Sequence, residues 1–159
     1  MHIADFLSPD DVICDVRASD KKRLVKDLTA RAAQALRLDA AALAGAIAQR
    51  ERLGSTGMGN GIAIPHARIA NLSKPFGILA RLKRAIDFAA IDGAPVDIVF
   101  LLLLPAAPDG EQLTALASVA RKLRDARVTA DLRGAADSGE IYRTIIDEQP
   151  PSGARGAGR

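Results

Sequence analysis

The chain has 159 residues, of which 48% are hydrophobic, 26% charged and only 3% aromatic, and its formal net charge is +3. These values are typical of one globular domain with a core of small aliphatic side chains. They argue against a nucleic-acid surface, which needs clustered cations and stacking aromatic rings. The longest apolar run, 98–104, is far shorter than the ~20 residues that cross a bilayer, so we expect no membrane insertion.

Cysteine usage and the N-terminus both bear on the compartment. Cys14 is the single cysteine, which excludes an intrachain disulfide and fits a reducing environment. Residues 1–11 carry acids and a proline where a secretory signal peptide needs a basic start and an apolar run. We therefore expect a cytoplasmic protein.

The first fifty residues contain one strand pattern followed by two helix patterns. Apolar residues alternate over 12–16, which predicts a short strand, and recur at helical spacing over 24–36 behind a Ser-Asp pair that can cap a helix. Asp39 is placed to cap a second helix, whose pattern ends near Arg50 and Glu51. This helix is expected to deliver Arg50 to the edge of the glycine-rich segment that follows.

Residues 54–66 combine that glycine-rich segment with a proline and a histidine. Four glycines within 54–61 cannot sustain a helix, so we expect a loop there. Residues 62–64 have the alternation of a half-buried strand, which Pro65 then ends. His66 is therefore expected at a strand terminus.

The middle of the chain supplies the expected core of the sheet. Residues 76–82 predict a strand, and 96–105 form an almost continuous apolar run that closes with a proline. A strand without a polar face has to be covered on both sides, which implies helices on both faces of the sheet. We therefore predict an α/β fold, with a single three-layer α/β/α domain and a mixed sheet.

The last third of the chain has helical patterns. Asp109 and Gln112 resemble a capping box ahead of a helix whose apolar face consists of Leu113, Leu116, Ala120 and Leu123. A short helical piece is expected near 130–132, and Asp137 is placed to cap a last helix that ends near 146.

Composition also sets the expected domain boundaries. The segment 148–159 is rich in Pro, Gly and Arg and cannot bury enough apolar surface to offset the entropy of ordering. We predict one domain over 1–147 and a disordered tail over 148–159.

Several kinds of chemistry are excluded by the residues present. Gly54 and Gly59 have the spacing of a phosphate loop, but Asn60 and Gly61 replace its lysine and hydroxyl residue, and a strand follows where a helix is needed. One cysteine and two distant histidines do not make a metal site. No G-x-S-x-G nucleophile elbow is present. We predict no metal and no cofactor.

His66 is the remaining candidate for chemistry. A neutral imidazole has a nucleophilic nitrogen near pH 7 and can accept a phosphoryl group or act as an acid or base. Pro65 fixes the chain that enters His66, the glycines would keep bulky side chains out of the space before the ring, and Arg50 and Arg68 could neutralise a phosphate. The alternative is that His66 only ends a strand.

The string QRERLGSTGMGNGIAIPHAR, residues 49–68, resembles the phosphorylation motif of the enzyme IIA components of the bacterial phosphoenolpyruvate-dependent phosphotransferase system, fructose and mannitol class. The nitrogen-regulatory type is the best match. By this resemblance His66 is the phosphorylated residue and Arg50 helps to hold the phosphate. Ser55 and Thr56 could add hydroxyl donors, although exposed loop hydroxyls usually bind water.

One position departs from the family pattern. Where the family usually has a second histidine after LLxP, this chain has Gln112, which can donate a hydrogen bond but cannot carry charge. We expect phosphotransfer through His66 to survive this departure, and the rate of transfer and the stability of the phosphorylated state to depend on it. Gln112 can equally be the third residue of a capping box, and the start of its helix could turn backbone N–H groups toward a phosphate.

The resemblance also implies partners. The donor would be a small phosphocarrier protein of the HPr type, and regulated target proteins would respond to the phosphorylation state of His66. Two alternatives stay open: a free-standing sugar-specific IIA that passes phosphate to a separate IIB protein, and a binding module that has lost phosphotransfer.

Overall fold

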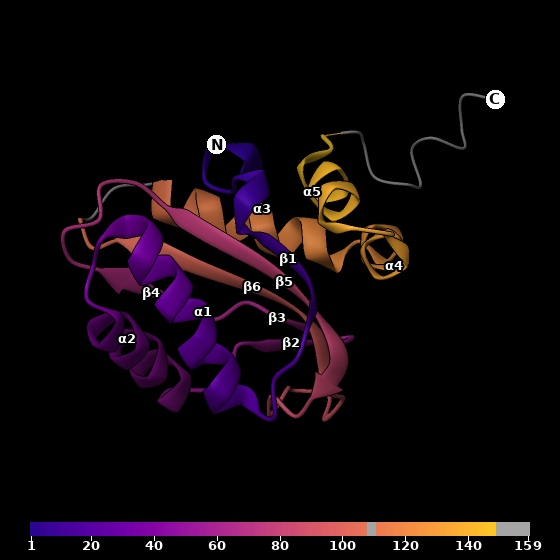
Figure 1. The fold of residues 1–159 in the computed structure, drawn as a ribbon, viewed down its shortest axis with the longest axis horizontal. Helices are drawn as coiled ribbons and strands as arrows, with labels where there is room; N and C mark the ends of the chain where they lie inside the picture. The colour runs from indigo at the N-terminus through magenta and orange to yellow at the C-terminus, as the bar shows by residue number, and fades with distance from the viewer. Residues whose placement is uncertain (108–110, 149–159) are drawn as a thin grey trace.

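A mixed six-stranded sheet lies between two layers of helices (Figure 1). The structure is a computed structural model that describes residues 1–107 and 111–148, without the side chains of Glu111 and Gln112. The strands are β1 (Val12–Val16), β2 (Gly57–Gly59), β3 (Ile62–Ala63), β4 (His66–Ile69), β5 (Phe76–Ile86) and β6 (Val96–Pro105). The helices are α1 (Lys21–Leu36), α2 (Ala40–Arg52), α3 (Glu111–Arg124), α4 (Ala126–Gly134) and α5 (Ser138–Ile146), with short 3-10 turns at Ile3–Asp5 and Pro9–Asp11.

The strands follow the order β1-β5-β6-β3-β2, and β4 pairs with β6 beyond the end of β3. β1 runs parallel to β5, β5 runs antiparallel to β6, and β3 and β4 both run parallel to β6. The register of β3 on β6, with Ile62 opposite Ile98, continues unchanged into β4, where His66 lies opposite Leu102. β3 and β4 are therefore one strand that is interrupted at Ile64 and Pro65.

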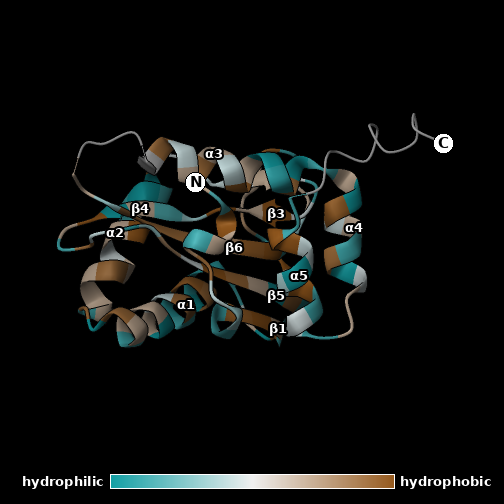
Figure 2. Cartoon of the chain, turned by 90° about the horizontal axis from the view of Figure 1, so that it is seen from above, coloured by the Kyte–Doolittle hydropathy of each residue, from teal (hydrophilic) through white to brown (hydrophobic). Residues whose placement is uncertain are grey.

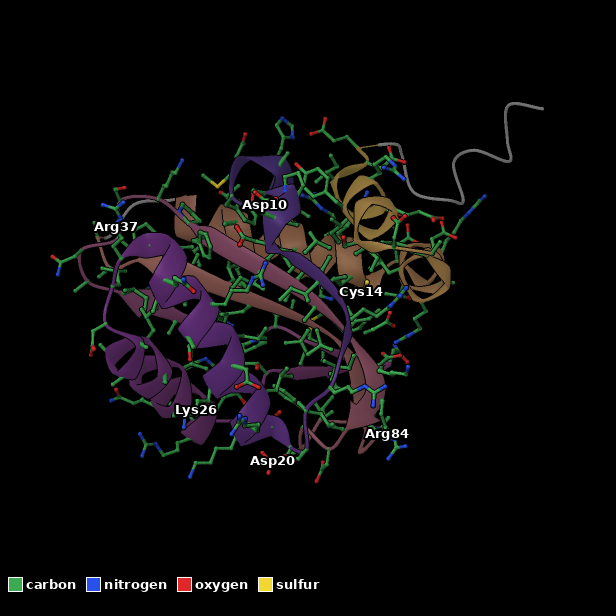
Figure 3. All side chains as sticks on the ribbon, viewed as in Figure 1. Asp10, Cys14, Asp20, Lys26, Arg37 and Arg84 are labelled. Atoms are coloured by element: carbon green, nitrogen blue, oxygen red, sulfur yellow. The ribbon has the colours of Figure 1, made fainter. Side chains whose placement is uncertain are left out.

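The side chains of β6 alternate between two cores, which explains the continuous apolar run. Val99, Leu101 and Leu103 pack under α1 and α2, whereas Phe100 and Leu102 pack under α3, α4 and α5. Figure 2 shows the hydrophobic strands enclosed by helices whose polar residues are turned outward, and Figure 3 shows charged side chains such as those of Lys26, Arg37 and Arg84 at the periphery. The predicted three-layer α/β/α domain with a mixed sheet is confirmed.

The expected helix caps are present. The side chains of Asp20, Asp39 and Asp137 accept hydrogen bonds from backbone N–H groups of the first turns of α1, α2 and α5. Two predicted elements were too short, because β5 continues to Ile86 and α4 begins at Ala126, behind a cap by Asp125. The end of β5 is held by the pair of Ile86 with Val96 of β6, and the first turn of α4 by the Asp125 cap.

The apolar face predicted for α3 is wrong at its start. The fully buried residues of this helix are Ala115, Val119 and Leu123, which lie one turn apart, whereas Leu113 is 71% exposed. Leu116 and Ala120 are only partly buried. The helix is therefore rotated relative to the prediction, and it presents Leu113 to solvent.

The glycine-rich segment is a hairpin where a loop was predicted. β2 pairs antiparallel with β3 across a two-residue turn. Asn60 and Gly61 have φ values of 57° and 80°, which a type I′ turn requires at both central positions. The Asn-Gly pair between two strands was the sequence signal for this hairpin.

Some of the residues on which predictions were made are outside the described part of the chain. Asp109 and nearly all of the predicted tail, 149–159, are outside it, so the capping box and the disorder of the tail stay predictions. Within residues 1–107 and 111–148, no helix has both the length and the apolar character needed to cross a bilayer.

Candidate active site

His66 is the first residue of β4, directly after the interruption in the strand. Ala67 and Ile69 point into the core under α1 and α2. Because side chains alternate along a strand, His66 and Arg68 share the opposite side of β4. The prediction of a strand terminus is confirmed, but His66 opens a second strand and does not end the first, and residues 62–64 are buried, not half-buried.

The imidazole is held by one hydrogen bond that defines its tautomer. Nδ1 of His66 lies 2.7 Å from the carbonyl oxygen of Ile64. A carbonyl oxygen can only accept, so the neutral ring carries its hydrogen on Nδ1 and has its lone pair on Nε2. Nε2 has no hydrogen-bond partner among the described side chains. The free nitrogen is therefore the nucleophilic one.

The surroundings of His66 favour its neutral form. Burial lowers the pKa of the imidazole below its usual value of 6.5, and the positive charge of Arg50 lowers it further. The hydrogen bond to Ile64 and the negative charge of Glu51 act in the opposite direction without reversing the shift. At neutral pH the ring is accordingly uncharged, with its hydrogen on Nδ1 and the nucleophilic lone pair on Nε2.

Two arginines lie beside the ring. Arg50 is in the last turn of α2, where its Nη1 donates to the carbonyl oxygen of Gly54 at 2.9 Å. A cavity of about 470 Å³ brings Arg50 and Arg68 together with His66 between α2, β4 and α3. The three residues thus line one cavity, and their role at a phosphate stays a prediction.

An adjoining cavity of about 510 Å³ lies along α3 and shares Arg50 and His66 with the first. Arg124, in the last turn of α3, also lines it. Sequence reasoning missed Arg124 because basic residues are common in the last turn of any helix. Leu113 lines both cavities, so the first turn of α3, which contains the backbone of Gln112, borders the site. The side chain of Gln112 is outside the described part of the chain.

The two hydroxyl groups proposed for the site are engaged within the protein. Ser55 Oγ donates to the carbonyl oxygen of Phe88 at 2.7 Å and accepts from the N–H group of Gly57 at 3.0 Å. Thr56 is 7% exposed, and its hydroxyl donates to the Glu51 carboxylate. Both residues line the second cavity, but they would have to exchange these bonds to bind a phosphate.

Two of the glycines also permit close packing on the hairpin. A Cβ atom on Gly57 would lie 2.8 Å from Cα and Cβ of Ala90, and one on Gly61 would lie 2.5 Å from Nη2 of Arg133. These glycines let the loop around Ala90 and the Arg133 side chain pack closely on the hairpin. Gly57 also lines the second cavity together with His66, so the expectation that glycines leave space beside the ring stays a prediction.

No three or more His, Cys, Asp or Glu side chains within residues 1–107 and 111–148 are grouped so that they could hold a metal ion.

Known proteins share both the sequence and the fold. Residues 5–148 match the family model described as the phosphoenolpyruvate-dependent sugar phosphotransferase system, EIIA 2. The chain is 40% identical over 154 residues to a nitrogen regulatory protein of Bradyrhizobium diazoefficiens, an alignment that covers 97% of this chain and 99% of the relative.

Solved structures agree with these matches. The crystal structure of the nitrogen regulatory protein IIA-Ntr from Neisseria meningitidis superimposes with a TM-score of 0.85 and 31% identity, over 90% of this chain and 98% of that one. IIA mannitol from Escherichia coli shares the fold, with a TM-score of 0.71 at 17% identity over 87% and 97% of the two chains. The chain belongs to the EIIA 2 family of the phosphoenolpyruvate-dependent phosphotransferase system and is a phosphoryl-transfer component of that system.

Proposed function

We propose that His66 is the phosphoryl acceptor of this protein and that a phosphocarrier protein of the HPr type is the donor. The observation that carries the proposal is the 2.7 Å hydrogen bond from Nδ1 of His66 to the Ile64 carbonyl oxygen. It leaves the lone pair on Nε2, and His66 lines both cavities. A donor side chain can therefore approach the nucleophilic nitrogen.

The proposed phosphoryl transfer is direct, from the donor histidine to His66, and needs no cofactor. The Nε2 lone pair attacks the phosphorus atom of the donor phosphohistidine, and the P–N bond of the donor breaks with its electron pair returning to the donor ring. His66 keeps its Nδ1 hydrogen, so the positive charge that develops on its ring is stabilised by the Ile64 carbonyl oxygen. Phosphoryl transfer depends mainly on such positioning and on neutralisation of charge.

The cations of the two cavities supply that neutralisation. Arg50 borders both cavities, Arg68 borders the first and Arg124 the second. A phosphoryl group on Nε2 would lie beside cavities that are lined by guanidinium groups, whose planar donors suit phosphate oxygens. The N–H groups at the start of α3 are further candidate donors. Gln112 stays a candidate phosphate ligand from the sequence alone, since its side chain is outside the described part of the chain.

We also propose that phosphorylation switches the binding of regulated target proteins in the cytoplasm. The relatives named nitrogen regulatory proteins support a regulatory role. Leu53 and Leu113 beside the cavities are 84% and 71% exposed, which gives a partner an apolar surface next to the reacting nitrogen. A phosphate adds up to about two negative charges at this surface, enough to change which partner docks.

A reconstituted phosphorylation assay tests the proposal. The protein is incubated with phosphoenolpyruvate, enzyme I and the HPr-type carrier, and its intact mass is measured. We expect the wild-type protein to gain one acid-labile, base-stable phosphate and His66→Ala to gain none. In Arg50→Ala the rate of phosphorylation should be lowered about 10- to 100-fold.

Arg52→Ala is the matched control for Arg50→Ala. It removes the same charge two residues further along α2, and Arg52 lines neither cavity. A normal rate is expected. Unchanged phosphorylation of His66→Ala would exclude His66 as the acceptor, and a wild-type protein without any adduct would favour a binding module.

Purified IIB proteins distinguish the regulator from a sugar-specific IIA. A regulator is expected to keep its phosphate when mixed with them. Rapid transfer to a IIB cysteine would instead assign the chain to sugar uptake.

A further inference from the structure

A buried carboxylate lies one residue after Arg50 and faces the hairpin that leads to His66. The side chain of Glu51 is only 9% exposed, and its Oε2 lies 2.6 Å from Nζ of Lys21 in the first turn of α1. Lys21 also reaches the loop before Ala90, where its Nζ lies 3.4 Å from the Phe88 carbonyl oxygen and 4.4 Å from the centroid of the Phe88 ring. The Glu51 carboxylate is therefore ion-paired with a lysine of α1, which is itself anchored at Phe88.

Glu51 uses both of its oxygens on one residue of the hairpin. Oε1 accepts the hydroxyl hydrogen of Thr56, and Oε2 accepts the backbone N–H of Thr56 at 3.2 Å. Together these bonds fix the Thr56 side chain and its peptide group. A buried carboxylate that holds one residue by two bonds leaves that residue little freedom.

Thr56 continues the connection toward the imidazole through the backbone. Its carbonyl oxygen accepts the N–H group of Ile64 at 3.1 Å, and the Ile64 carbonyl oxygen accepts Nδ1–H of His66 at 2.7 Å. The last acceptor is the one that defines the tautomer of His66. An unbroken series of hydrogen bonds thus joins Glu51 to the nucleophilic ring.

We infer that Glu51 is a positioning residue, which acts through Thr56 and Ile64 to hold the His66 ring in the orientation and tautomer that phosphoryl acceptance requires. The inference rests on the proposed function. The Glu51 oxygens bind Thr56 and Lys21, and the negative charge of Glu51 would disfavour a nearby phosphate, so we assign it no role as a phosphate ligand. The ion pair with Lys21 reduces that repulsion while the carboxylate keeps its two hydrogen bonds to Thr56.

Two measurements on Glu51→Gln test the inference. Nitrogen chemical shifts of the His66 ring report its tautomer without any phosphorylation, and we expect a clear increase of the Nε2–H form. In the reconstituted assay we expect kcat to fall about 10- to 100-fold with the KM for the carrier unchanged, because the docking surface is intact while the ring is misplaced.

Thr56→Val and Thr56→Ser provide a second route if Glu51→Gln does not fold. Thr56→Val removes only the hydroxyl that Glu51 accepts from, and it should shift the tautomer and kcat in the same direction by a smaller factor. Thr56→Ser keeps that hydroxyl and should have the wild-type His66 tautomer and kcat. Asp27→Asn is the control, since it removes an exposed α1 carboxylate paired with Arg23, and wild-type values are expected.

The outcomes separate this inference from the function on which it rests. A folded Glu51→Gln or Thr56→Val protein with the wild-type tautomer and the wild-type kcat would overturn the inference. A shifted tautomer in a protein whose wild type is never phosphorylated would uphold the positioning of the ring and overturn the proposed function. A normal tautomer with a raised KM would also overturn the inference, because Glu51 would then act on docking.

Discussion

β6 and the interrupted strand β3–β4 lie side by side but differ in what they do. β6 is hydrogen-bonded on both sides, and its residues from Ile98 to Leu104 are at most 5% exposed. β3–β4 keeps a constant register on β6, yet it contains Pro65, which cannot donate to the sheet, and directly after Pro65 the half-buried His66. The regular strand provides rigidity, and the interrupted one provides the reactive group.

The interruption explains how a sheet can present a nucleophile. At Ile64 the carbonyl group accepts from the imidazole of His66, while the Pro65 carbonyl still accepts from Leu102 at 2.9 Å. The ring is therefore oriented by the carbonyl group of Ile64, and the next carbonyl group along the chain, that of Pro65, is bonded to the rigid strand β6. We expect substitutions in β6 to affect stability, and substitutions around the interruption to affect function.

The sharpest test compares two residues that lie opposite each other in the ladder. Leu102 is fully buried under α3, α4 and α5. Leu102→Ala should lower the free energy of unfolding by about 2–5 kcal/mol, because apolar burial is lost and a cavity is left. His66→Ala should cost less than about 1 kcal/mol, because the ring is half-exposed and makes one hydrogen bond. Urea unfolding of both variants measures the two values. Equal losses would mean that His66 is a structural residue.

The second test concerns the close packing of the hairpin. Gly57→Ala would bring a methyl group to 2.8 Å from the Ala90 backbone, and we expect a loss of about 1–3 kcal/mol in the free energy of unfolding. Because the hairpin holds Ile64, the His66 tautomer should also become mixed. A variant of normal stability would show that the loop at Ala90 moves away easily.

A third, smaller effect of opposite sign serves as the control for glycine substitution. Gly45 lies on the exposed side of α2, and a Cβ atom there meets nothing within 4 Å. Gly45→Ala should raise the free energy of unfolding by about 0.5–1 kcal/mol, since alanine favours the helix. Phosphorylation should be unchanged. Destabilisation by Gly45→Ala would indicate a contact at this face of α2.

The smallest expected effect is a dependence of stability on pH that comes from His66. Its pKa in the folded state lies below the unfolded value of about 6.5, so the unfolded chain binds more protons in this range. This contribution is complete above pH 6.5 and is lost as the pH falls through the folded-state pKa. It should be absent from the unfolding curves of His66→Gln.

NMR titration of His66 gives the same shift directly and assigns its causes. Removal of the positive charge in Arg50→Ala should raise the pKa of His66, and removal of the negative charge in Glu51→Gln should lower it. A His66 pKa above 6.5 in the wild-type protein would contradict the burial of the ring.

Local patterns in the sequence determined the layers, the helix caps and the reactive residue. The apolar run of β6, the three aspartate caps and the combination of Pro65 with His66 each depend on neighbours within a few positions, so they can be recognised without the fold. The tertiary structure alone decided the rotation of α3, which exposes Leu113, the inclusion of Arg124 in the site, and the path from Glu51 to Thr56. These features arise because segments distant in sequence, such as α1, α2 and the loop at Phe88, pack against one hairpin, and no local pattern records which side chains then meet.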